Sequence, residues 1–165
     1  MTRSPYTDSP VVTTTVRLLA PGVLTYGLFT LFHGTSSVGG GFQGGVIAAA
    51  MVVTVAFALG IRRTAAWLDR RALSALVAAG PVVFGVVALA GVALGGAFLQ
   101  LDVLPIPKAT VYATEAIEVG IGATVAAVIV VLFVRIADGY EEPQEADTSV
   151  VDGGTTPSVE VPADD

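Results

Sequence analysis

The chain has 165 residues, of which 53% are hydrophobic and 13% are charged, and its mean hydropathy is +0.77. This composition excludes an ordinary soluble domain and predicts an all-α integral membrane protein. The chain contains no cysteine and a single histidine, which excludes disulfides, thiolate chemistry and multi-histidine metal sites, so we expect no metal and no cofactor.

Four apolar segments follow one another along the chain, and each approaches the length of about twenty residues that crosses a bilayer. Residues 1–16 are polar and are expected to form an exposed N-terminal arm, whereas residues 17–136 form one membrane domain. A cleaved signal peptide is the alternative for the first segment, but no small-residue cleavage site is evident after Phe32. The expected spans are about 18–33, 42–61, 72–99 and 111–135.

The net charge of −6 is concentrated at the C-terminus, because residues 138–165 hold nine of the fourteen acidic residues and no Lys or Arg. The segment 137–165 is also rich in Thr, Ser, Pro and Gly, and it has too few apolar residues to offset the entropy of ordering. We therefore expect a disordered acidic tail.

The arginines predict how the spans are oriented, because Lys and Arg in short loops stay on the cytoplasmic side. With the 62–71 loop inside, Arg3, Arg17 and Arg135 also lie inside, and only Lys108 lies outside. Both termini are then cytoplasmic. The glycine-rich loop 34–41 and the loop 100–110 share the outer side, where His33, Asp102, Lys108 and the acids of the fourth span are able to approach one another.

Two carboxylates stand near the start of the fourth span. Glu115 and Glu118 are three residues apart and so lie on one helix face. Glu118 is expected inside the apolar zone, where an ionisable group usually lines an ion path, a water cavity or a protein interior. The alternatives are a structural, hydrogen-bonded carboxyl at Glu118 and a solvated rim acid at Glu115.

The segment from His33 to Gly45, between the first two spans, has a residue order that hydrophobicity alone does not explain. The pattern of Gly39, Gly41 and Gly44 matches a dinucleotide fingerprint formally, but it has no preceding strand and no βαβ unit, and no P-loop lysine follows. Two interpretations remain: close helix packing, or a broken-helix turn that lines a cavity. Packing also fits the small-xxx-small pair of Gly91 and Gly95.

His33 and Gln43 are the polar side chains at the two ends of this segment. A histidine titrates near neutral pH and relays protons, but it also caps a helix or braces a loop. Gln43 forms hydrogen bonds between helices in lipid, either for function or for packing.

These residues resemble a known family. His33-Gly34, followed by Gly39-Gly40-Gly41-Phe42-Gln43-Gly44-Gly45, resembles the His-Gly-His-x-x-Pro-Gly-Gly-Gly-Phe-x-Gly-Gly motif of the MnhB/MrpB subunits of multisubunit Na⁺/H⁺ antiporters. The run that begins at Glu118 is similar to the acidic-x-Gly-Val motif of that family's last helix. The chain departs from the pattern at Thr35, which replaces the second histidine, and at Val38, which replaces the proline.

The resemblance covers residues 17–136 and implies a multi-pass subunit of the plasma membrane, a transporter component rather than an enzyme. Its expected partners are the other membrane subunits, the transported Na⁺ and H⁺ and the lipid bilayer, without nucleic acid. Glu118, with Glu115, either lines an ion or proton path or anchors a neighbouring subunit, and His33 with the glycine loop shapes the outer mouth. The alternatives are the equivalent module of an ion-translocating membrane hydrogenase and a purely structural scaffold.

Overall fold

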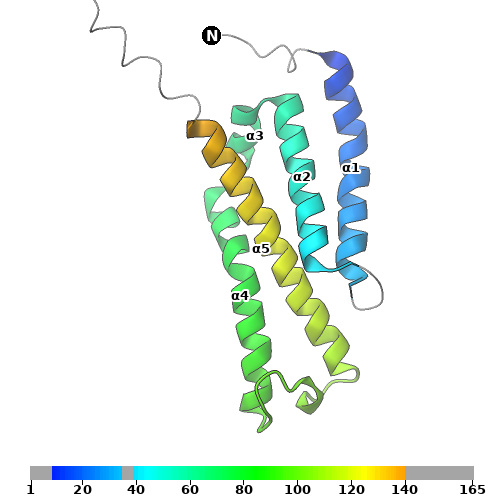
Figure 1. Ribbon diagram of the computed structural model, residues 1–165, viewed down its shortest axis with the longest axis vertical. Helices are drawn as coiled ribbons and strands as arrows, with labels where there is room; N and C mark the ends of the chain where they lie inside the picture. The colour runs from blue at the N-terminus through cyan, green and yellow to red at the C-terminus, as the bar shows by residue number, and fades with distance from the viewer. Residues whose placement is uncertain (1–8, 35–38, 140–165) are drawn as a thin grey trace, which may run out of the picture.

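The computed structural model describes residues 9–34 and 39–139, and this part of the chain contains helices and no strand (Figure 1). Four of its helices are long and apolar enough to cross a membrane, which confirms the predicted fold class. The N-terminal residues 1–8, the acidic tail from residue 140 and the positions Thr35 and Val38 lie outside the described residues. The elements are α1 (Pro10–Phe32), α2 (Gly41–Leu59), α3 (Ile61–Trp67), α4 (Arg70–Ala93), η1 (Leu101–Val103) and α5 (Ala109–Gly139).

The helix ends differ most from the expected spans at the start of α1 and at the end of α4. α1 begins at Pro10, within the expected polar arm, because a proline in the first turn has the right φ and needs no hydrogen-bond partner for its nitrogen. α4 ends at Ala93 rather than near residue 99, since Gly95 takes a φ of +84°. The amide of Gly95 donates to Val92 O at 3.0 Å and that of Gly96 to Gly91 O at 2.9 Å, which is a Schellman ending.

The four long helices lie in a row, in the order α1, α2, α5, α4, rather than in a closed bundle (Figure 1). α2 packs against α1 on one side and against α5 on the other, and α4 packs against α5. The start of α1, the short helix α3 and the end of α5 lie at one end of the row. The end of α1, the start of α2 and the α4–α5 connection lie toward the other end.

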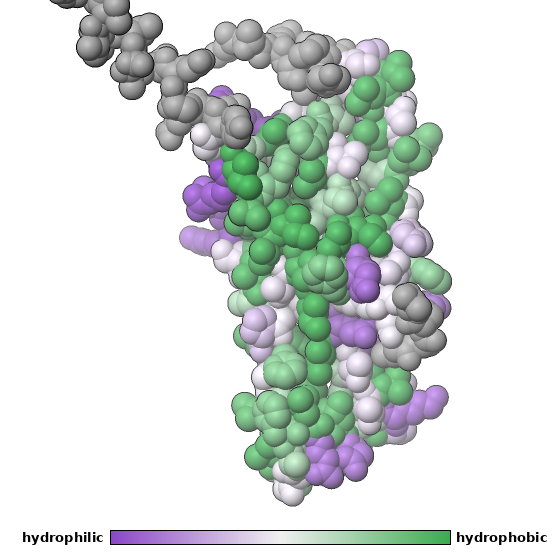
Figure 2. All heavy atoms as spheres, in the orientation of Figure 1, coloured by the Kyte–Doolittle hydropathy of each residue, from purple (hydrophilic) through white to green (hydrophobic). Residues whose placement is uncertain are grey.

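Glycine and alanine account for most of the buried residues at the contacts between helices. The buried residues of α2 are all Gly or Ala, and no large side chain is fully buried in the described residues. Large apolar side chains point outward instead, and the face in Figure 2 is apolar along most of its length. A soluble monomer does not expose such a surface to water, so the apolar exterior agrees with helices that are able to cross a membrane.

A proline inside α4 is matched by a threonine of α5. Pro81 has no N–H, so the carbonyl of Val77, four residues earlier, has no helical donor. The Thr124 hydroxyl lies 3.0 Å from Val77 O and 3.2 Å from Leu76 O, and it accepts the Gly80 amide at 3.0 Å. A side chain from a neighbouring helix thus satisfies the backbone at this break.

Candidate functional site

Glu118 lies on α5, the longest of the helices that are able to cross a membrane, and its distance along that helix from Arg135 is compared with the thickness of a bilayer. At 1.5 Å per residue it is about 25 Å from Arg135, and Glu115 is about 30 Å from Arg135. A hydrocarbon core is about 30 Å thick. If Arg135 were placed at the boundary on one side, Glu115 would fall at the opposite boundary and Glu118 about one helical turn inside it.

The glycine segment forms the surface on which the Glu118 side chain rests. A Cβ atom at Gly34 would collide with Glu118 Oε2, and one at Gly40 would lie 3.6 Å from the carboxyl carbon and both of its oxygens. A Cβ at Gly41 would collide with the Glu118 backbone carbonyl. The two motifs found separately in the sequence therefore meet at one place, and the absence of side chains on the three glycines makes room for the acid.

Gly39, Gly40 and Gly41, called the glycine turn below, are held against the end of α1. Gly40 N donates to Thr30 O at 3.1 Å, and Gly40 has a φ of +126°, a conformation that only glycine adopts readily. A Cβ at Gly39 would lie 2.7 Å from the same Thr30 oxygen. The backbone of the turn is thus held close to α1.

The electrostatic surroundings of Glu118 are unusual for an acid in an apolar layer. Its carboxyl lies next to Gly40, the N-cap of α2, and a helix N-terminus stabilises negative charge. Its Oε2 atom is buried and has no hydrogen-bond partner among residues 9–34 and 39–139. A buried oxygen without a donor costs about 1–3 kcal/mol, which binding of a proton or a cation would offset.

His33 lies at the C-terminal end of α1, directly before Gly34. Its side chain is exposed and its ring stacks on Phe29, with centroids 4.1 Å apart and an interplanar angle of 28°. Glu115 is half-buried, one turn from Glu118 toward the α4–α5 connection. His33 therefore stands beside the glycine turn with its ring accessible, and it also braces the end of α1.

The remaining residues of the glycine motif lie at the start of α2. Phe42 and Gln43 are exposed, whereas Gly44 and Gly45 are buried. A Cβ at Gly44 would lie 2.6 Å from Leu31 Cβ of α1, and one at Gly45 would lie 2.6 Å from Gly122 O of α5. Gly44 and Gly45 thus allow α2 to approach both neighbours.

The other expected clusters are arranged differently. Gly91 packs against the connection that follows α4, since its Cβ would lie 2.8 Å from Gln100 O, and Gly95 has open space around it. The α4–α5 connection, which contains Asp102 and Lys108, extends beyond the end of α1 and the start of α2 (Figure 1).

Sequence reasoning missed Thr124 as a site of helix contact. A threonine inside an apolar helix carries no signal of its own, but Pro81 predicts an unmatched carbonyl for which a donor must be found. Residues 9–34 and 39–139 contain no group of three or more His, Cys, Asp or Glu able to hold a metal ion.

Comparison with known families identifies the chain over most of its length. A family model described as "Domain related to MnhB subunit of Na+/H+ antiporter" matches residues 11–144, from the second residue of α1 to beyond the end of α5. No curated protein is significantly similar to the chain. The matched region contains both the glycine turn and Glu118.

Proposed function

Because the chain belongs to the MnhB family of subunits of multisubunit Na⁺/H⁺ antiporters, we propose that its specific contribution is Glu118, as a carboxylate in the ion or proton path of the complex. The glycine turn holds the carboxylate in place, and His33 exchanges protons with the outer solution. Na⁺ is the proposed coupling cation, and the plasma membrane is the proposed location.

One observation carries this proposal: Oε2 of Glu118 is buried, lies against Gly34 and has no hydrogen-bond partner in the part of the chain that the structure describes. A purely structural carboxyl in an apolar layer is expected to have its oxygens hydrogen-bonded, since unmatched polar groups are costly there. An acid with an unmatched oxygen is suited to bind and release a proton or cation.

The substitution Glu118→Gln tests the path role, because it preserves the shape of the side chain and removes its charge. We expect the variant complex to assemble and to lose most of its Na⁺-dependent proton movement in vesicles. Asp102→Asn is the matched control, since it neutralises an exposed acid outside the span. Full transport by an assembled Glu118→Gln complex would exclude the path role.

A scaffold function is the second candidate, and the backbone contacts of Gly44 and Gly45 together with the exposed apolar face favour it. On that view Gly40→Leu prevents assembly, while His33→Ala and Glu118→Gln leave transport unchanged. Purification of the complex with its bound membrane subunits separates an antiporter host from a membrane hydrogenase host.

A further inference from the structure

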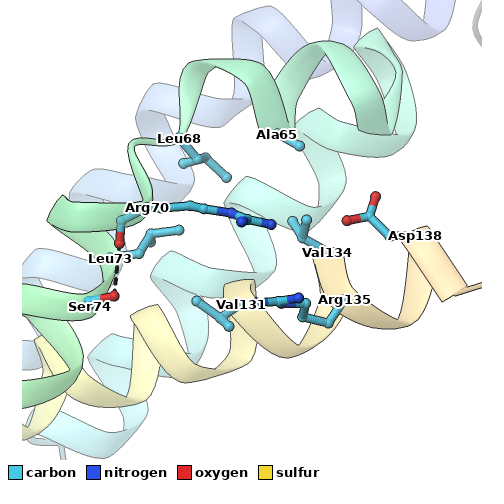
Figure 3. Close-up of a pocket in the computed structure, with 9 residues that line it drawn as sticks. All are labelled: Ala65, Leu68, Arg70, Leu73, Ser74, Val131, Val134, Arg135 and Asp138. Atoms are coloured by element: carbon cyan, nitrogen blue, oxygen red, sulfur yellow. Dashed lines mark hydrogen bonds between the residues drawn. The ribbon is translucent and has the colours of Figure 1, made fainter.

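A second polar feature lies at the opposite end of the row, between α3, α4 and α5. It is a cavity of about 270 Å³, close to the roughly 300 Å³ of the smaller ligand pockets in proteins. Figure 3 shows Arg70, from the start of α4, reaching across toward Val134, with Arg135 of α5 beside Val131. Ala65, Leu68, Leu73, Ser74 and Asp138 complete the lining.

The two guanidinium groups in this cavity have no anionic partner in the described part of the chain. The Ser74 hydroxyl donates to the backbone oxygen of Arg70 at 2.9 Å. Within residues 9–34 and 39–139, neither arginine side chain forms an ion pair or a hydrogen bond. Two arginines from different helices thus face one partly apolar hollow. Guanidinium groups bind phosphate oxygens through paired, charge-assisted hydrogen bonds.

We infer that this cavity, the Arg70–Arg135 pocket, binds a phosphate group, and that the headgroup of an anionic phospholipid supplies it. Leu68, Leu73, Val131 and Val134 form apolar walls suited to the glycerol and upper acyl region of a lipid, which free phosphate lacks.

The position of the pocket at a membrane surface supports a lipid. Trp67, next to the lining residue Leu68, is 63% exposed, and the Arg63 guanidinium lies 5.7 Å from the centre of its ring. Tryptophan and arginine together are typical of the headgroup layer. The predicted cytoplasmic orientation of this end would also place it at the leaflet that carries anionic lipid in cells, where basic pockets between helices bind such headgroups.

Substitution of Asp138 tests the proposal by an expected increase in lipid binding rather than a loss. This exposed carboxylate lines the pocket and repels a phosphate, so the arginines act against it. Asp138→Asn should therefore increase the amount of bound anionic lipid. A misfolded variant would not produce that gain.

The experiment uses the full-length chain purified in mild detergent, with native mass spectrometry to count retained lipid after incubation with phosphatidylglycerol or phosphatidylcholine. Arg70→Gln/Arg135→Gln is the test variant. Arg63→Gln/Arg71→Gln is the control, because it removes the same charge from the same end outside the pocket lining. Inorganic phosphate, added as a competitor, distinguishes a free ion from a headgroup.

We expect the unmodified chain to retain phosphatidylglycerol in preference to phosphatidylcholine. The test variant should bind phosphatidylglycerol at least roughly tenfold more weakly than the unmodified chain, because it loses charged hydrogen bonds to the phosphate. The control should stay within about twofold, and Asp138→Asn should retain more. If millimolar inorganic phosphate displaces the bound phosphatidylglycerol, the pocket binds phosphate but its ligand is the free ion, and the lipid proposal is overturned. Equal loss in both double variants, or no loss in either, would overturn the proposal.

A chain that ends at Gly139 addresses a competing occupant, the acidic segment that follows α5. If the full chain retains no phosphatidylglycerol and the shortened chain does, that segment occupies the pocket and the lipid proposal is overturned. Similar retention by both chains supports the proposal. Circular dichroism and elution volume establish that each variant is folded.

Discussion

The hydroxyl oxygen of Thr124 lies 3.0 Å from the carbonyl oxygen of Val77, the residue whose helical donor is removed by Pro81. The same hydroxyl accepts the Gly80 amide, and a Cβ at Gly80 would lie 2.5 Å from it. The glycine and the proline of α4 and the threonine of α5 thus form one joint. This joint sets how α4 packs against α5, the helix that carries Glu118.

Thr124→Val should destabilise the complex by about 1–2 kcal/mol, because it leaves backbone groups of α4 without partners while preserving side-chain volume. The check is the thermal midpoint of the purified complex. Thr54→Val is the control, since the Thr54 hydroxyl only donates to Ala50 O within its own helix. In the double variant with Pro81→Ala, the loss of stability caused by Thr124→Val should be smaller, because the backbone N–H of residue 81 then donates to Val77 O. If the effects of the two substitutions on the thermal midpoint simply add, Thr124 and Pro81 do not act together as proposed.

Some features of this fold were accessible from sequence and others were not. The four spans followed from apolar length, and Glu118 and the glycines were found separately by charge and by composition. The arginines placed the glycine loop and these acids toward the same side, but the contact of Glu118 with Gly34 and Gly40 was not predictable, because it depends on where α2 and α5 meet and not on spacing along the chain. The early start of α1 did have a signal, a serine followed by Pro10, which is a common helix beginning.

The helix contacts of α2 should be sensitive to a single methyl group. Gly45→Ala places a Cβ 2.6 Å from Gly122 O and 3.0 Å from Val125 Cβ, so α2 and α5 must separate. We expect a loss of about 1–3 kcal/mol and less assembled complex on copurification. Gly22→Ala, where nothing lies within 4 Å, should be neutral or slightly stabilising. Equal effects at the two positions would mean that close approach of α2 to α5 is not required.

His33 combines an accessible ring with a stacking contact, and the two roles are separable. His33→Phe keeps an aromatic ring against Phe29 and removes the titratable nitrogens. We expect normal assembly with at least a severalfold loss of Na⁺-dependent proton movement, in the range of lost proton-transfer steps. Transport at the unmodified rate by His33→Phe, together with a loss in His33→Ala, would show that the ring only braces α1.

The orientation of the row can be tested directly, because the chain has no native cysteine. Ala66 of α3 and Ala97 of the α4–α5 connection are both exposed, at opposite ends of the row. In intact cells, an impermeant maleimide should label Ala97→Cys and spare Ala66→Cys until the membrane is opened. The reverse pattern would contradict the assignment made from the arginines.

The contact between Gly34 and Glu118 should appear as coupling between two substitutions. Gly34→Ala places a methyl group against Oε2 and 2.6 Å from Gly40 Cα, so both the carboxyl and the turn must shift. We expect about 1–3 kcal/mol of lost stability and reduced transport, whereas Gly85→Ala, with open space around it, should be tolerated. Glu118→Asp shortens the acid by one methylene and should recover part of the stability lost in Gly34→Ala, but not transport, because the carboxylate is then displaced. The two single variants and the double variant are compared by the thermal midpoint of the complex and by proton movement in vesicles. Zero coupling in stability would mean that the glycine turn does not support the acid.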